Sequence, residues 1–275
     1  MTGPHHTPAH EHNRRAWNEL VRQKQRFTRP AVDEDFREPL KVVDQLGWLG
    51  ADIRGLRVLC LAAGGGRQGP LYAAAGAIVT VVDLAPAMLE LDRQVAAERG
   101  LSLRTVECSM DDLSMFAAGE FDLVIHPVST CYVPKIQPVF DAVARVVTAG
   151  GAYISQHKTP TSLQADIHPS ARGYELIEPY YREGPLPPVI GSKHREEGTL
   201  EYLHRWEEIL GGLCRAGFVI EDVVEPLHAE KDAPAATFAH RSRWIAPYVR
   251  IKARRKGAGA GENGGDASSK IWIPG

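Results

Sequence analysis

RVLCLAAGGGRQGP, residues 57–70, joins a short apolar run to a glycine-rich turn. The run RVLCL predicts a buried β-strand, and the residues after Gly66 predict the first helix. Gly64, Gly66 and Gly69 have the spacing GxGxxG, which lets a backbone approach an anionic group at the start of a helix. The stretch therefore predicts a parallel α/β sheet with a nucleotide-type ligand at the end of its first strand.

Apolar runs and helical stretches alternate after this turn, as they do in βαβ units. We expect strands at 57–61, 77–83, 103–107, 121–126, 152–157, 218–225 and 246–253. We expect helices after Gly66 and at 33–46, 86–100, 136–151 and 199–218. Since the central runs are almost wholly apolar, the sheet is predicted to be covered on both faces.

The flanking segments differ from this core in composition. Residues 1–12 are polar and rich in histidine, and residues 257–275 are rich in glycine, so both are predicted to be disordered. One domain is expected over 13–256. Its parts are an N-terminal helical cap (13–50), a ligand-binding core (57–157), a proline-rich lid insertion (158–198) and C-terminal helix and strands (199–256).

Charge and cysteine content exclude several classes of function. The 32 Lys and Arg residues nearly balance 34 Asp and Glu residues, for a net charge of −2, so no overall field attracts nucleic acid or an anionic membrane. The four cysteines form no CxxC pair, and no apolar stretch is long enough for a membrane span. We expect a cytoplasmic protein with no structural metal, in which the N-terminal histidines bind metal only adventitiously.

Asp83 narrows the choice of ligand. It ends the second expected strand and follows Gly64 by 19 residues, which is close to the position of the ribose-binding acid in dinucleotide-binding folds. A carboxylate there can accept both hydroxyl hydrogens of a ribose. By spacing alone, NAD(P) and S-adenosylmethionine both remain possible, since each has a ribose diol and an anionic group.

Three ordered phrases resemble motifs of the class I S-adenosylmethionine-dependent methyltransferases: VLCLAAGGG (58–66), VVDLAPAML (81–89) and VVTAGGAYI (146–154). The resemblance implies a Rossmann-like α/β fold, with a seven-stranded, mostly parallel sheet, helices on both faces and an antiparallel last strand. It also implies in-line methyl transfer from S-adenosylmethionine to a small-molecule acceptor, with S-adenosylhomocysteine as product. The alternatives are an NAD(P)-dependent oxidoreductase and a non-catalytic S-adenosylmethionine-binding protein.

The resemblance also assigns cofactor-binding residues. They are Ala62, Gly64, Gly65, Gly66, Asp83, Leu84, Met88, Ser109, Met110, Asp111 and Pro127. Two positions depart from the usual pattern. Cys60 stands where the family often has an acid that fixes the glycine loop, and Ser109 stands where an adenine-contacting Asp is common, a contact that Asp111 could make instead.

Candidate catalytic residues follow the fourth and fifth strands, where the resemblance places the methyl group. His126 and His157 are the candidate bases, and Tyr132 is a candidate for orienting the acceptor. Candidate acceptor-binding residues are Trp17, Ser129, Lys158, Tyr180, Tyr181 and His204. Their aromatic content favours an acceptor with an apolar body.

Nucleic acid is not an expected partner. The phrase HPVS (126–129) takes the place of the NPPY-type tetrad of DNA base methyltransferases, and the basic run 250–256 reads as a solvated edge. The sequence leaves open whether the protein is a monomer or a homodimer.

Overall fold

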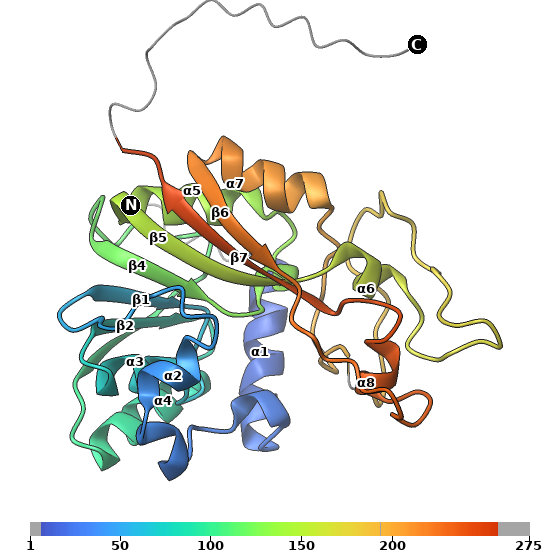
Figure 1. Cartoon of the computed structure of the whole chain (residues 1–275), viewed down its shortest axis with the longest axis horizontal. Helices are drawn as coiled ribbons and strands as arrows, with labels where there is room; N and C mark the ends of the chain where they lie inside the picture. The colour runs from blue at the N-terminus through green and yellow to red at the C-terminus, as the bar shows by residue number, and fades with distance from the viewer. Residues whose placement is uncertain (1–6, 193, 258–275) are drawn as a thin grey trace, which may run out of the picture.

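The computed structural model describes residues 7–192 and 194–257, which form a sheet in the order β3-β2-β1-β4-β5-β7-β6 with helices on both faces (Figure 1). The strands are β1 (Arg57–Leu61), β2 (Ile78–Asp83), β3 (Leu103–Glu107), β4 (Phe121–His126), β5 (Val147–Lys158), β6 (Phe218–Val224) and β7 (Tyr248–Arg255). Strands β1 to β5 are parallel, and β7 is antiparallel to both β5 and β6. The predicted Rossmann-like α/β fold with seven strands and an antiparallel last strand is confirmed.

The helices are α1 (Pro8–Arg22), α2 (Pro39–Val43), α3 (Gln68–Ala74), α4 (Pro86–Glu98), α5 (Gln137–Val146), α6 (Pro160–Gln164), α7 (Gly212–Arg215) and α8 (Phe238–Arg241). Strand β1 shows how they cover the sheet. Leu59 and Leu61 face the apolar layer that contains α5 and α7, whereas Val58 and Cys60 face the layer that contains Tyr72 of α3. Because successive side chains of a strand point to opposite faces, an unbroken apolar run fits a strand that is buried on both sides.

The N-terminal helix begins earlier than the predicted start at Asn13. The Thr7 hydroxyl accepts a hydrogen bond from the His10 backbone N–H, and Pro8 occupies the first helical turn, so a capped helix starts at Pro8. Residues 7–12 are therefore ordered, against the prediction. Residues 1–6 and 258–275, which complete the two predicted disordered ends, lie outside the described residues.

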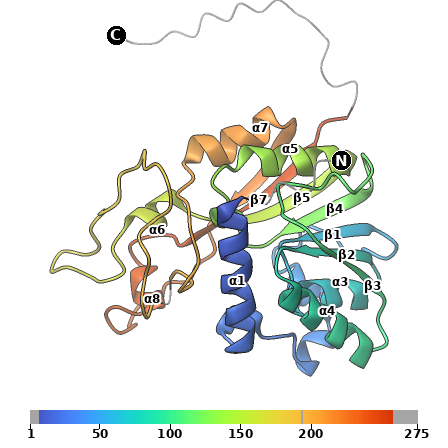
Figure 2. The same ribbon diagram turned by 180° about the vertical axis from the view of Figure 1, so that it is seen from behind.

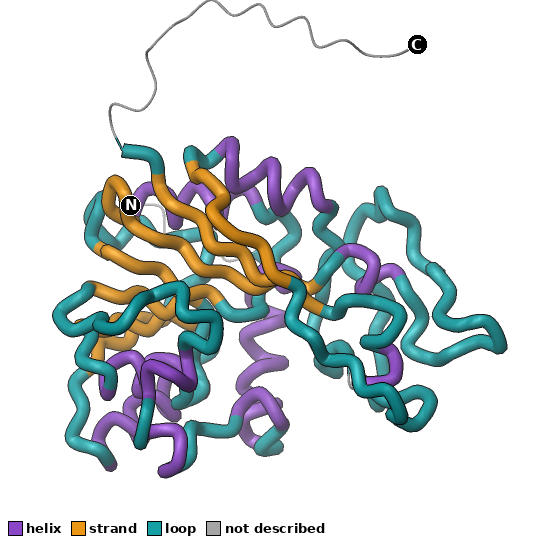
Figure 3. Tube along the Cα trace, viewed as in Figure 1, coloured by secondary structure: helices purple, strands orange, loops and turns teal. Residues whose placement is uncertain are grey.

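A lobe of loops lies beside the carboxyl end of the sheet; it comprises residues 159–192, 194–205 and 225–247. Figures 2 and 3 show helix α1 between this loop lobe and the sheet core, with few helical turns in the lobe itself. The lobe contains the predicted lid insertion. The helix expected at 199–218 is shorter than predicted, because residues 199–205 have no regular secondary structure and helical turns start only at Trp206.

Hydrogen bonds to distant segments explain why residues 199–205 are not helical. The Tyr202 N–H donates to the Cys131 carbonyl, and the Glu201 carbonyl accepts from the Leu186 N–H. These backbone groups are then unavailable to a helix. The apolar spacing of this stretch therefore indicated a helix wrongly.

Two other boundaries differ from the predictions. The helix expected at 33–46 is split into a 3₁₀ turn (Asp33–Phe36) and α2, because Pro39 lacks the N–H that a continuous helix needs. Strand β5 begins at Val147 rather than at 152, since Val147 already pairs with Phe121 of β4 across an irregularity in the register.

Candidate functional site

A cavity of about 700 Å³ opens at the carboxyl ends of β1, β2 and β4. The strand order reverses between β1 and β4, and open α/β sheets bind ligands at such a point. Helix α1 and the loop that follows it, the β-strand ends and the loop lobe all contribute to its wall. The cavity is therefore large enough for two small ligands side by side.

Asp83 lies in the cavity wall at the end of β2. Its Oδ2 accepts the Gly64 backbone N–H at 3.0 Å, and its Oδ1 accepts the Ala85 N–H at 2.9 Å. Burial raises the pKa of Asp83 to about 6, although both hydrogen bonds oppose the rise. The carboxylate is thus oriented before any ligand binds, and it is ionised at neutral pH.

The glycine loop faces Asp83 at close range. A Cβ at Gly64 would lie 2.7 Å from Met88 Cβ and 3.0 Å from Asp83 Oδ2, so a side chain there does not fit. Gly65 has φ +117°, a conformation that favours glycine. The loop therefore presents bare backbone to the cavity, as close approach of a ligand requires.

Asp92 on α4 supports this loop from behind. It is fully buried, and its Oδ2 accepts the Gly65 N–H at 2.9 Å. Burial raises the pKa of Asp92 to about 7. Cys60 stands where the family often has an acid, but no local motif identifies Asp92 as the carboxylate that bonds the Gly65 N–H.

Most of the predicted cofactor-binding residues line the cavity. Those in its wall are Ala62, Gly64, Gly65, Asp83, Leu84, Met88, Ser109, Met110 and Pro127. Gly66 and Asp111 are not part of the wall formed by the described residues. The Gly66 carbonyl instead accepts from Ala31, and Asp111 contacts His10 of α1 at 3.3 Å.

The rest of the wall combines aromatic side chains with polar and charged ones. It includes the predicted residues Trp17, Ser129 and Tyr132, and Trp17 packs edge-on against Tyr132 with ring centroids 5.6 Å apart. Wall residues that the sequence reading missed include Asn13, Arg26, Arg29, Val133, Gln156, Glu196, His228, Phe238 and Tyr248.

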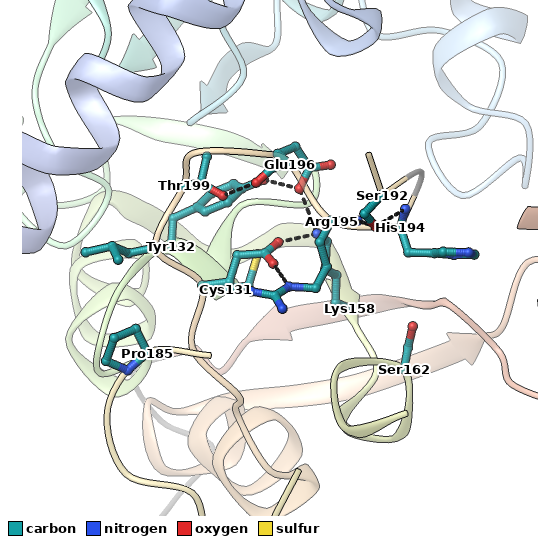
Figure 4. A network of polar contacts seen from close by, with 12 residues as sticks. Cys131, Tyr132, Lys158, Ser162, Pro185, Ser192, His194, Arg195, Glu196 and Thr199 are labelled. Carbon is teal, nitrogen blue, oxygen red and sulfur yellow. Dashed lines mark hydrogen bonds and ion pairs between the residues drawn. The ribbon is translucent and has the colours of Figure 1, made fainter. Parts of the chain in front are cut away.

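Glu196 connects the cavity to a buried network of charged side chains (Figure 4). Its Oε2 accepts hydrogen bonds from Tyr132 Oη and Lys158 Nζ, each at 2.7 Å. Lys158 also pairs with Glu201, which pairs in turn with Arg195. Lys158 is 3% exposed and Glu201 is 0% exposed, so the predicted acceptor-binding Lys158 reaches the cavity only through Glu196.

Two predicted catalytic histidines lie outside the cavity wall formed by the described residues. His126 contacts Tyr153 Oη and Ser129 Oγ, both at 2.7 Å, and burial lowers its pKa to about 3. His157 contacts Thr130 at 2.8 Å, and burial lowers its pKa well below the usual value. Both imidazoles are neutral and surrounded, which makes them poor proton acceptors.

Three predicted acceptor-binding residues are also absent from the described cavity wall. His204 is buried and contacts the Thr130 carbonyl at 2.9 Å. Tyr180 Oη accepts the Trp206 N–H, and Tyr181 is 75% exposed. These residues organise the loop lobe and do not face the cavity.

Asn13 ties the parts of the acceptor end together. Its Nδ2 donates to the carbonyls of Tyr132 and Leu200, each at 3.0 Å, and its Oδ1 accepts the Leu200 N–H at 2.7 Å. Asn13 is 2% exposed. One amide thus joins α1, the loop after β4 and the segment that follows Glu196.

The described residues contain neither a cluster of metal ligands nor a helix that could span a membrane. Within residues 7–192 and 194–257, no group of three or more His, Cys, Asp and Glu side chains is arranged to hold a metal ion. In the same ranges, no helix has both the length and the apolar character needed to cross a membrane.

Comparison with known proteins identifies relatives. Residues 59–155 match the model of a methyltransferase domain. The uncharacterized methyltransferase YbaJ of Bacillus subtilis is 36% identical over 230 residues, which cover 78% of this chain and 89% of that protein.

Solved structures share the fold. An S-adenosylmethionine-dependent methyltransferase from Mesorhizobium loti superposes with a TM-score of 0.60 at 21% identity, covering 80% of this chain and 100% of the other. Geranyl diphosphate C-methyltransferase from Streptomyces coelicolor, solved with Mg²⁺, geranyl diphosphate and S-adenosylhomocysteine, gives a TM-score of 0.59 at 18% identity, covering 92% of this chain and 100% of the other.

Proposed function

Because this chain belongs to the class I S-adenosylmethionine-dependent methyltransferases, we propose that its acceptor is a small molecule bound in the aromatic end of the cavity. Family membership favours S-adenosylmethionine over NAD(P), and transfer over mere binding. Three features support a small acceptor: the volume of about 700 Å³, the aromatic wall and the cover of α1 and the loop lobe.

We propose that the cofactor lies between Asp83 and the glycine loop. Both Asp83 oxygens already accept backbone hydrogen bonds, so the carboxylate is aimed where a ribose diol would meet it. Leu84, Met88 and Met110 would enclose the adenine, and Ser109 would bond its edge. The orientation of the Asp83 carboxylate is the observation that most supports this cofactor site. When bound, the cofactor supplies an electrophilic methyl group.

The protein's own contribution is then position and exclusion of water. We propose that Pro127 and Ser129 flank the reacting end and that Trp17 and Tyr132 hold the acceptor body. For His126 and His157 we propose a structural role, because both rings are buried and satisfied. They keep the ends of β4 and β5 in place.

The test separates acceptor classes. The purified protein is incubated with methyl-labelled S-adenosylmethionine and a cell extract that has been divided into metabolites, nucleic acids and proteins. We expect label in the metabolite fraction and S-adenosylhomocysteine as co-product. Label only in the macromolecular fractions would refute the small-molecule acceptor.

A further inference from the structure

Glu196 contributes a charged carboxylate to the cavity wall. The hydrogen bonds from Tyr132 and Lys158 both end on Oε2, and among the described residues no N–H or O–H donates to Oε1. Figure 4 shows Oε1 pointing away from Lys158. The side chain is 11% exposed and belongs to the cavity wall. Glu196 therefore contributes a carboxylate to the wall of the cavity where the acceptor is proposed to bind.

The Glu196 carboxylate is held in its charged form. Burial alone would raise its pKa, but the Lys158 ammonium and the side-chain hydrogen bonds with Lys158, Tyr132 and Glu201 bring the pKa below the ordinary value. Lys158 stays protonated for the same reason, because Glu196 and Glu201 raise its pKa against the effect of burial. A charged carboxylate oxygen without a donor is a strong hydrogen-bond acceptor.

We infer that Glu196 Oε1 accepts a hydrogen bond from an uncharged hydroxyl group of the methyl acceptor, an inference that rests on the small-molecule methyltransferase function proposed above. The hydrogen bonds from Tyr132 and Lys158 to this carboxylate end on Oε2, so Oε1 can accept one from a ligand hydroxyl that enters the cavity. Glu196 is thus a specificity-determining residue at the acceptor end of the cavity.

The balance of charge favours a hydroxyl over an ammonium group. The network pairs two cations, Lys158 and Arg195, with the carboxyl groups of Glu196 and Glu201, and burial raises the pKa of Glu201, so the network has no surplus negative charge for a ligand cation. A ligand cation would leave an uncompensated charge in this buried place, which is costly.

The wall around Glu196 suits an apolar body attached to that hydroxyl. Trp17, Tyr132, Val133, Phe238 and Tyr248 line the same cavity. Aromatic side chains of this kind stabilise flat apolar groups by burial and edge contacts. The expected acceptor is therefore a hydroxyl compound with an aromatic or other apolar skeleton.

The test uses the full-length protein and three probes of similar shape: para-cresol, para-xylene and benzylamine. Calorimetry first measures S-adenosylhomocysteine binding, which tests the cofactor site alone. With that site saturated, ligand-observed NMR measures probe binding. We expect para-cresol to bind at least about threefold more tightly than para-xylene, because its hydroxyl can bond a charged acceptor, and benzylamine to bind more weakly than para-cresol.

Variants test whether Glu196 causes the preference for para-cresol over para-xylene. Glu196→Gln should reduce the preference for para-cresol, and the neighbouring exposed Glu197→Gln should leave it unchanged. Since Glu196→Gln leaves Lys158 short of one partner, a second variant combines Glu196→Met with Lys158→Met and preserves the Arg195–Glu201 pair. In this double variant para-xylene should bind better than para-cresol, since only apolar contacts remain.

The outcomes separate the two proposals. Failure to bind S-adenosylhomocysteine contradicts the proposed function. Normal cofactor binding with no preference for para-cresol overturns only the inference about Glu196, as does a preference that persists in the double variant or a tighter binding of benzylamine. Absence of binding by all three probes also overturns the inference, because the cavity would then not take a small hydroxyl compound.

Discussion

The affinity for the cofactor should depend on pH through Asp83. This carboxyl is buried, and its pKa is raised to about 6 in the unliganded protein. A ribose diol donates hydrogen bonds to the ionised form, so binding must lower the pKa of Asp83. A proton therefore has to leave before binding, and the affinity falls as the pH drops through 6.

The size of the effect follows from the fraction ionised. With a pKa of about 6, roughly one molecule in ten carries the carboxylate at about pH 5, and nearly all do at about pH 7.5. The dissociation constant for S-adenosylhomocysteine should therefore rise about tenfold between these values, which is about 1.4 kcal/mol. Asp83→Asn should weaken binding at least about tenfold at the higher pH and remove most of the pH dependence.

Isothermal titration calorimetry at the two pH values measures this directly, with Asp52→Asn as the control, since Asp52 is exposed and outside the described cavity wall. Binding of S-adenosylhomocysteine near pH 6 should also release a proton from Asp83. Titrations in two buffers of different ionisation enthalpy detect this release. If Asp83→Asn keeps the wild-type affinity or the full tenfold change with pH, Asp83 does not hold the ribose.

Three further predictions concern the glycine loop, the hydrogen bonds of Asn13 and the buried carboxyl group of Asp92. Gly64→Ala should weaken S-adenosylhomocysteine binding more than tenfold by calorimetry, because its Cβ meets Met88 at 2.7 Å, whereas Gly257→Ala, with open space around it, should not. Asn13→Ala should lower the free energy of unfolding in urea by about 2–4 kcal/mol through three lost hydrogen bonds, whereas the exposed Arg15→Ala should change it little. Asp92 binds a proton more tightly when folded, with a pKa of about 7, so the wild-type melting temperature should fall as pH rises from about 4 to 7, and less so in Asp92→Asn.

Local patterns were sufficient to predict the sheet. Strands β1, β2 and β4 are mostly apolar and end at Leu61, Asp83 and His126, so their positions and parallel direction followed from the alternation with helices. Prediction failed where a backbone bonds to distant segments. Residues 199–205 have helical apolar spacing, yet their N–H and C=O groups bond to Cys131 and Leu186, partners that no local pattern reveals.

The same contrast between local motifs and contacts with distant segments separates the two ends of the cavity. The proposed cofactor-binding residues Gly64, Asp83 and Met88 come from one continuous stretch, and short motifs predict their roles. The acceptor end is assembled from segments far apart in the chain, and Glu196 meets Tyr132 and Lys158 only after folding. The sequence held one signal for Glu196, its position in a proline-rich insertion predicted to form a wall, but nothing distinguished it from the exposed Glu197.

The glycine loop illustrates how a departure from a motif is compensated. Cys60 is fully buried, and Asp92 approaches the same loop from α4, where its charge contributes to raising the pKa of the Cys60 thiol. An acid at position 60 would place a second carboxylate beside Asp92, and two buried carboxylates cannot both ionise cheaply. We therefore expect an acid at only one of positions 60 and 92, and in this chain it is Asp92 on α4. In this chain the contact to the glycine loop comes from Asp92 on the neighbouring helix α4, whose Oδ2 accepts the Gly65 N–H.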